Sequence, residues 1–115
     1  MKTSSDVLDR VTRVPGVRGA LLVAATDGLV VAEHLMDGVD GRAAAALAAS
    51  LVGRLARTAA ESGLRHPTFV HLRADAGSVL VAPGKDDLVL VAVVGPEANM
   101  GLARLEMLDA AGRLG

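Results

Sequence analysis

The chain contains no cysteine, no tryptophan and no tyrosine, and Phe69 is its single aromatic residue. Without cysteine it cannot form disulfides or thiolate-ligated metal sites, and this composition predicts a cytoplasmic protein. Without aromatic rings it has almost no surface on which nucleic-acid bases could stack. The formal net charge is only −1, with both signs well mixed along the chain, so no basic patch is available for phosphates. We therefore expect no nucleic-acid partner.

Long apolar runs are also missing, although 51% of the residues are hydrophobic. No run approaches the roughly 18 residues that a membrane-spanning helix needs. The N-terminal stretch MKTSSDVLDR is polar and has no apolar centre of the kind found in signal peptides. A chain of 115 residues fits one domain with one hydrophobic core. We expect a single domain over residues 1–115, with its core at about 4–112, and no direct membrane insertion.

Residue patterns that carry chemistry are scarce. The histidines His34, His66 and His71 have no second ligand at the i, i+3 or i, i+4 spacing that is typical of helical metal sites. Gly84-Lys85 lies between two strand-like runs and does not lead into a helix, so it indicates a turn rather than a phosphate-binding loop. The sequence has no Gly-x-Ser-x-Gly motif and no grouping of serine, histidine and acid. It therefore predicts no enzymatic activity, no metal and no cofactor.

The most informative stretch that the chain does contain is residues 40–63, DGRAAAALAASLVGRLARTAAESG. Asp40 is a suitable N-cap, Gly63 suits the position just past a helix end, and the alanine-rich interior favours a helix. At 100° per residue this helix has two non-polar faces. The first is a core stripe formed by Ala44, Ala48, Leu51, Val52, Leu55 and Ala59. The second contains only small residues and is formed by Ala45, Ala49, Gly53, Ala56 and Ala60.

A row of small side chains lets another backbone come close, so we interpret the second face as the place where a second copy of the chain packs. The alternative is that a general bias toward alanine filled surface positions. Polar residues occupy the remaining circumference, and they are Arg42, Ser50, Arg54, Arg57 and Glu61. Two interpretations of these arginines stay open. They form a solvated face, with Arg57 supporting Glu61 at i, i+4, or they reach a partner's phosphate.

The remaining elements follow from hydrophobic periodicity and turn residues. A short helix is expected over residues 4–14, ended by Pro15-Gly16. Strands at 17–26 and 29–35 flank Asp27-Gly28, which is a strong hairpin signal because its turn uses positive φ at both positions. Three more strands and a last helix are expected at 68–73, 78–83, 88–94 and 97–113.

The polarity of the strands predicts their order in the sheet. Strands 17–26 and 88–94 are apolar on both faces and therefore belong in the centre. Strands 29–35 and 68–73 carry charge and histidine and therefore belong at the edges. The sequence thus predicts an α/β protein of the α+β kind, α-β-β-α-β-β-β-α, with one five-stranded antiparallel sheet in the order 2-1-5-4-3. The long helix covers one face, and the terminal helices cover the other.

This order of elements, with three stretches of sequence, resembles the Roadblock / dynein light chain family, and in particular its bacterial group of Ras-like GTPase regulators. The stretches are GVRGALLVAATDGLVVAEH, the alanine-rich second helix, and VAVVGPEANMGLARLEM. They contain the "strand, Asp-Gly, strand" opening at Asp27-Gly28 and the start of the last helix at Asn99-Met100-Gly101, leading to Glu106-Met107. The resemblance covers about residues 4–112.

The resemblance implies a small cytoplasmic homodimer in which the second helices pack antiparallel and the third strands join two sheets. It also implies binding of a small Ras-like GTPase, as regulator or scaffold, through a platform built by the paired second helices. The expected dimer interface consists of Ala45, Ala49, Gly53, Ala56, Ala60, Phe69 and His71. The expected partner-binding residues are Ala46, Ser50, Arg54 and Arg57.

Two other functions remain compatible with the sequence. A small-ligand sensor would place a pocket between the sheet and the helices, and a co-purified small molecule would reveal it. A purely structural adaptor would dimerise and tether other proteins without contacting a GTPase, and its binding would not depend on the nucleotide.

Overall fold

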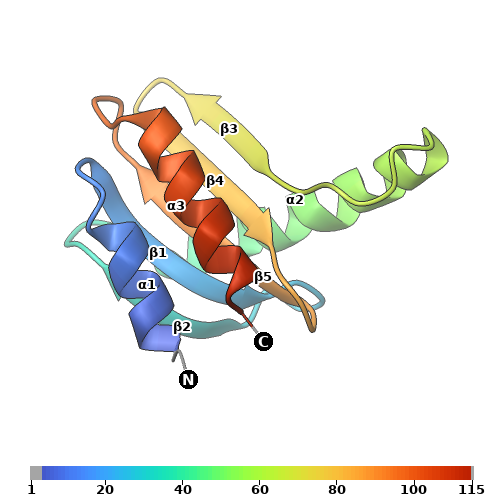
Figure 1. The fold of residues 1–115 in the computed structure, drawn as a ribbon, viewed down its shortest axis with the longest axis horizontal. Helices are drawn as coiled ribbons and strands as arrows, with labels where there is room; N and C mark the ends of the chain where they lie inside the picture. The colour runs from blue at the N-terminus through green and yellow to red at the C-terminus, as the bar shows by residue number, and fades with distance from the viewer. Residues whose placement is uncertain (1–3, 115) are drawn as a thin grey trace.

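The computed structural model describes residues 4–114. Eight elements follow one another in the expected order α-β-β-α-β-β-β-α (Figure 1). The elements are α1 (Ser4–Thr12), β1 (Val17–Ala24), β2 (Val30–Leu35), α2 (Gly41–Glu61), β3 (Val70–Ala74), β4 (Gly77–Pro83), β5 (Leu88–Val94) and α3 (Met100–Gly112).

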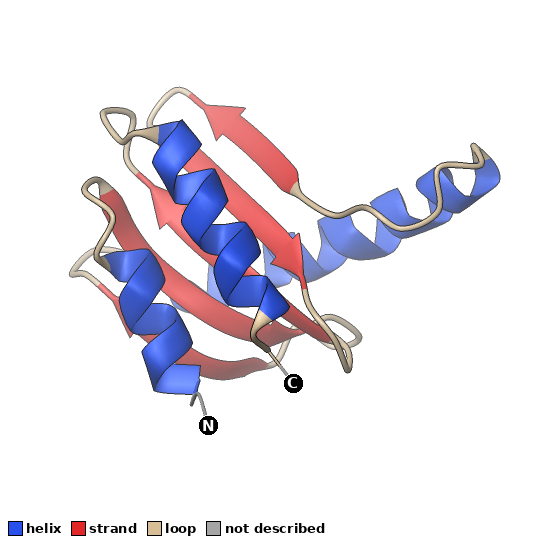
Figure 2. Cartoon of the chain, viewed as in Figure 1, coloured by secondary structure: helices blue, strands red, loops and turns tan. Residues whose placement is uncertain are grey.

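The five strands form one antiparallel sheet in the order β2-β1-β5-β4-β3, which confirms the predicted topology (Figure 2). The two central strands, β1 and β5, are almost entirely buried, as their continuous apolar sequences indicate. The edge strands β2 and β3 contain the exposed positions. Hydrophobic patterning therefore carried enough information to order all five strands.

The sheet separates two hydrophobic clusters, so the fold has three layers. On one face α1 and α3 lie side by side (Figure 1), and their buried side chains, including Leu8 and Met107, pack on Leu22 and Leu90. On the other face only α2 covers the sheet, and Ala45 and its neighbours pack on the valine-rich side of β1, β4 and β5. None of the helices within residues 4–114 has the length and hydropathy of a membrane-spanning segment.

Both predicted ends of α2 are confirmed. The side chain of Asp40 accepts a hydrogen bond from the backbone N–H of Ala43 at 3.0 Å, as an N-cap does. At the other end Gly63 has a φ of +76°. The N–H of Gly63 bonds the carbonyl of Ala60, and the N–H of Leu64 bonds the carbonyl of Ala59. This pair of bonds is a Schellman motif, and it satisfies carbonyls that would otherwise lack partners.

The core stripe predicted for α2 is correct only in its first half. Ala44 and Ala48 are buried and Val52 packs partly against the sheet, but Leu51 and Leu55 are only half-buried. The reason is geometric, because α2 runs across the sheet and then continues past its β3 edge, as Figures 1 and 2 show. No α2 residue after Val52 therefore packs against the core cluster on this face of the sheet.

The turn between β1 and β2 differs from the tight two-residue hairpin that Asp27-Gly28 predicts. Ala24 and Leu29 close the strands, with the N–H of Ala24 bonding the carbonyl of Leu29 at 2.9 Å. Only Gly28 has positive φ, at +73°. Asp27 instead accepts a hydrogen bond from the N–H of Leu29. The loop is longer by two residues than a two-residue hairpin, and the Asp27 side chain and the N–H of Gly28, which bonds the carbonyl of Ala24, help to hold it.

The turn between β4 and β5 supports the β1–β2 turn. Asp86 and Asp87 have φ of +57° and +64°, a conformation that aspartate tolerates better than most residues. Asp87 accepts hydrogen bonds from the hydroxyl and the N–H of Thr26 at 2.6 and 3.1 Å. Gly84-Lys85 belongs to this turn, as predicted.

The last helix begins three residues later than predicted. Asn99 is its N-cap, and the Asn99 side chain accepts a hydrogen bond from the N–H of Leu102 at 3.0 Å. Residues 96–98 form the turn before it. The start at Asn99-Met100-Gly101 that the family resemblance indicates is therefore the correct one.

We predict that Gly77→Ala lowers the free energy of unfolding by roughly 2 to 4 kcal/mol. Gly77 closes the β3–β4 hairpin with a φ of +152°, and an added Cβ would overlap the carbonyl oxygen of Val94. Gly38→Ala is the matched control, because Gly38 also has positive φ but has open space around it. Its cost is about 1 to 2 kcal/mol. If urea titrations show that Gly77→Ala and Gly38→Ala lower the free energy of unfolding equally, the overlap with Val94 does not contribute to the cost.

Candidate protein-interaction surface

The outward face of α2 carries the residues predicted to bind a partner. Ala46, Ser50, Arg54 and Arg57 recur at every third or fourth position and therefore share one face of the helix. All four are exposed, and Arg42 continues the same face toward the N-terminus. This face points away from the sheet, because Ala44 and Ala48 on the opposite side are buried against it.

The three arginines of this face are not neutralised within the part of the chain that the structure describes. The ion pairs of residues 4–114 involve Arg10, Arg113 and His34, and none lies on α2. The suggested i, i+4 pair of Arg57 with Glu61 is not formed. The outward face of α2 therefore presents uncompensated positive charge, flanked by alanine, serine and glycine.

The stripe of small residues divides into three parts. Ala45 is fully buried in the chain's own core, so its assignment to a dimer interface is wrong. Ala49 lies against the β1–β2 turn, since a Cβ built on Gly28 would lie 3.6 Å from the Cβ of Ala49. Gly53 and Ala60 are exposed, and a Cβ added at Gly53 meets nothing within 4 Å. Only the second half of the stripe is open to another molecule.

Residues 53–61 of α2 extend past the β3 edge and form its projecting half. A groove with a volume of about 440 Å³ separates this half from the segment that leads into β3. Leu55 and Ala59 form its helical wall, and Leu64 and Val70 contribute apolar surface opposite them. Leu64 is 74% exposed, so it adds open apolar surface to the groove. The groove thus combines the half-buried side of α2 with the approach to the β3 edge.

Phe69 and His71, the other two residues expected at the dimer interface, lie at this edge, but their side chains have partners within the chain. The Phe69 ring packs against the core beneath α3 and lies 5.6 Å from the guanidinium carbon of Arg104. The Nε2 atom of His71 lies 3.0 Å from the hydroxyl of Ser78, a buried side chain of β4. Both residues could join an interface through their backbone at the strand edge.

The two edges of the sheet differ in how easily they accept another strand. On β2 the register shifts next to Val31, which forms a β-bulge, because Leu22 pairs with Ala32 and Val23 with Val30. Bulges hinder edge pairing. On β3 all five residues pair with β4 without a shift, from Val70–Val81 to Ala74–Gly77. The β3 edge is therefore the better template for pairing with another chain.

One cluster of polar side chains was not apparent from sequence spacing. Asp9 Oδ1 lies 3.0 Å from His34 Nδ1, and Ser5 Oγ lies 3.5 Å from His34 Nε2. This is the order of contacts in a serine-hydrolase triad, so the structure does group serine, histidine and acid. However, the Ser5 contact is long and all three side chains are open to water. We interpret the cluster as a link that ties α1 to β2.

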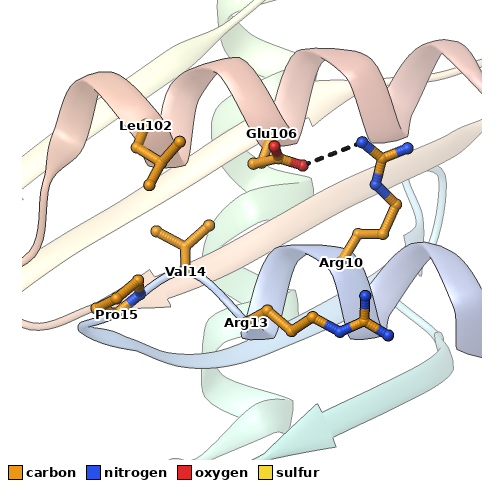
Figure 3. A pocket seen from close by; sticks show the side chains of 6 residues that line it. All are labelled: Arg10, Arg13, Val14, Pro15, Leu102 and Glu106. Atoms are coloured by element: carbon orange, nitrogen blue, oxygen red, sulfur yellow. Dashed lines mark hydrogen bonds and ion pairs between the residues drawn. The ribbon is translucent and has the colours of Figure 1, made fainter.

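A second hollow, of about 330 Å³, lies between α1 and α3 on the opposite face of the sheet (Figure 3). Val14, Pro15 and Leu102 form its apolar end. At the other end Arg10 bonds Glu106 at 3.4 Å, and also bonds Asp109 at 2.9 Å. Because the charges here pair with each other, this hollow is better explained as a seam between two packed helices than as a recognition site.

Within residues 4–114 no three side chains of the metal-binding types lie close enough to hold an ion. Three features of the described surface that lack partners are the outward face of α2, the groove beside β3 and the β3 edge. All three adjoin the projecting half of α2, so the arrangement is suited to binding protein surfaces.

Comparison with known families and structures gives a consistent result. Residues 3–94 match the model of the Roadblock/LC7 domain. The uncharacterised protein MJ0714 of Methanocaldococcus jannaschii is 32% identical over 108 residues, which cover 94% of this chain and 90% of that protein.

Two solved bacterial structures have the same fold. A Roadblock/LC7 domain from Streptomyces avermitilis superposes with a TM-score of 0.81 at 24% identity, covering 91% of this chain and 88% of that one. MglB of Myxococcus xanthus superposes with a TM-score of 0.83 at 20% identity, covering 96% and 92%. At these identities the two structures establish a shared fold.

We predict that leucine substitutions at the two ends of the small-residue stripe have different effects on the unfolding free energy. Ala45→Leu overpacks a buried site and lowers the unfolding free energy by about 1 to 3 kcal/mol at every protein concentration. Ala60→Leu lies at an exposed position, so it alters urea unfolding only through a concentration-dependent association. Urea titrations at two concentrations, about a hundredfold apart, distinguish these behaviours. A concentration-independent loss for Ala60→Leu would mean that this end of α2 also packs within the chain.

Proposed function

The chain belongs to the Roadblock/LC7 domain family, and we propose that it is a non-enzymatic, cytoplasmic homodimer that binds a small Ras-like GTPase and regulates or positions it. The observation that carries the proposal is the projecting half of α2, which leaves apolar helix surface and an open strand edge on the same side of the molecule.

The apolar surface of α2 and the open edge of β3 are explained together if two chains pair and each covers the surface that the other leaves open. Leu51 and Leu55 are half-buried, and neither belongs to the cluster that packs on the sheet of its own chain. On the same face of the sheet, Leu72 of β3 is 39% exposed, and Val70 is only half-buried. If two chains pair through their β3 edges, the projecting half of each α2 extends over the β3 region of the other chain. Each chain then covers the apolar surface that its partner leaves open.

The open part of the small-residue stripe supports close packing of the two α2 helices. Gly53 lies in the helix interior, where glycine is less favourable than alanine by about 1 kcal/mol. In the single chain no contact and no positive φ requires glycine at this position. Close approach of a second helix supplies such a reason, and Ala56 and Ala60 continue the same surface. We keep Ala49, Phe69 and His71 in the proposed interface and leave out Ala45.

The outward face of α2 is the proposed docking surface for the GTPase. A dimer with antiparallel α2 helices presents this face twice, with Arg54 and Arg57 beside small residues that allow close contact. The chain contributes no catalytic group in this scheme. Docking alters the nucleotide cycle by favouring one arrangement of the partner's own switch segments, which are ordered or released by the nucleotide state.

We predict that Gly53→Leu yields a folded monomer, whereas the native chain is a dimer in gel filtration with light scattering. The added side chain has open space in the single chain but would separate two closely packed helices. Gly53→Ala is the matched control. It raises the intrinsic stability of α2 by about 1 kcal/mol and should weaken the dimer less than leucine does.

Circular dichroism verifies that both Gly53 variants remain folded. A native chain that is monomeric at tens of micromolar would remove the basis of the dimer proposal. A leucine variant that dimerises with native affinity would place the interface elsewhere.

We predict that the dimer retains a small Ras-like GTPase in a pull-down when the GTPase is loaded with a non-hydrolysable GTP analogue, and retains it poorly when GDP is bound. Arg54→Ala should lower that affinity by roughly three- to tenfold, because it removes an unpaired charge from the docking face. Light scattering should show that its dimer is unchanged.

The nucleotide dependence separates regulation from tethering. Equal retention of both nucleotide forms would favour an adaptor that holds the GTPase without sensing its state. No retention of either form, with an intact dimer, would contradict the proposed partner.

A further inference from the structure

A groove of about 610 Å³ lies where the β1–β2 turn meets the first turns of α2. Leu29, Val30 and Ala46 supply its apolar surface, and Asp27 and Arg42 are the charged residues that line it. Leu29 is 64% exposed, and the neighbouring Val31 is 53% exposed. An open groove that contains exposed aliphatic side chains is a candidate for contact with another protein.

Contacts within the chain hold the groove in place. Gly28 lies against α2, because a Cβ added there would come within 3.9 Å of the backbone of Ala45 and Ala46. Asp27 and Asp87 brace the turn through hydrogen bonds to Leu29 and Thr26. Leu29 is therefore exposed on a braced turn, so it would lose little conformational freedom on binding.

Arg42 gives the groove its charge preference. It is the second residue of α2, where the helix dipole disfavours a cation. It forms no ion pair with any residue from 4 to 114. Asp27 also lines the groove, where its carboxylate accepts a hydrogen bond from the N–H of Leu29 and forms no ion pair with Arg42. Arg42 therefore stands where the helix dipole disfavours its charge and has no ion-pair partner among residues 4–114, so a carboxylate from outside would compensate it.

We propose that this groove receives an apolar side chain of a protein partner, and that an acidic residue next to that side chain pairs with Arg42. The proposal rests on the proposed function, since the groove continues the docking face along α2 from Arg42 to Arg54 and Arg57. It adds the chemistry of the partner, which presents an apolar residue flanked by Asp or Glu. The binding is therefore weakened by salt.

Site-specific photo-crosslinking tests where the partner lies. Leu29 is replaced by benzoylphenylalanine in the full chain, and the variant is irradiated in cells. Leu105 is the matched control, because it is also 64% exposed but lies on α3, across the sheet from α2. We expect Leu29 to give a product whose crosslinked peptide, identified by mass spectrometry, has an apolar residue within a few positions of Asp or Glu. Leu105 should not give this product.

Charge reversal at Arg42 tests the role of the cation. Arg42→Glu places an acid in the first turn of α2, so it should leave the fold at least as stable as the native chain. If Arg42 only stabilised α2, the Arg42→Glu variant would therefore give an unchanged yield of the Leu29 product. We expect Arg42→Glu to lower the yield of the Leu29 product at least about tenfold, and Arg42→Lys to restore most of it.

The outcomes separate this inference from the proposed function. Loss of the Leu29 product, a product that is indifferent to Arg42→Glu, or a crosslink to a basic segment, nucleic acid or a second copy of this chain would overturn the groove proposal. If the GTPase is still retained in pull-downs in such a case, the proposed function stands. If the Leu29 product is an acidic, apolar segment of a protein other than a GTPase, the groove proposal stands and the GTPase partner is rejected.

Discussion

The length of α2 relative to the sheet it covers is the constraint on which the rest of the surface depends. Its 21 residues span about 31 Å at 1.5 Å per residue. The axes of five strands, about 4.8 Å apart, span only about 19 Å. A helix that begins against Leu35 of β2 and Leu21 of β1 and crosses the sheet must therefore extend past the β3 edge. This single mismatch leaves Leu51 and Leu55 half-buried and places apolar helix surface beside an open strand.

The sequence predicted the topology because each strand reports its own environment. Continuous apolar runs identified β1 and β5 as central, and Glu33, His71 and Arg73 identified the edges. The ends of α2 were predictable for a similar reason, since Asp40 and Gly63 act on their immediate neighbours. Local chemistry was thus sufficient for the strand order and the ends of α2, although it did not give the length of the β1–β2 turn.

The sequence was insufficient where the outcome depended on how far one element extends over another. Helical periodicity tells which residues share a face, but not where along the helix that face stops being covered. Ala45 and Gly53 therefore appeared equivalent within one stripe, although one is fully buried and the other is exposed. The contact of Ala49 with Gly28 was hidden for the same reason, because it joins two elements whose spacing only the folded chain defines.

Different contacts therefore explain why small residues occupy successive positions along α2. Ala45 is small because the helix lies close on the sheet, and Ala49 is small because the β1–β2 turn lies against it. Neither cause extends to Gly53, where the single chain offers open space and where alanine would form a more stable helix. An explanation confined to one chain accounts for the first half of the stripe only. The second half is explained by a neighbour outside the chain, on the same side as the open edge of β3.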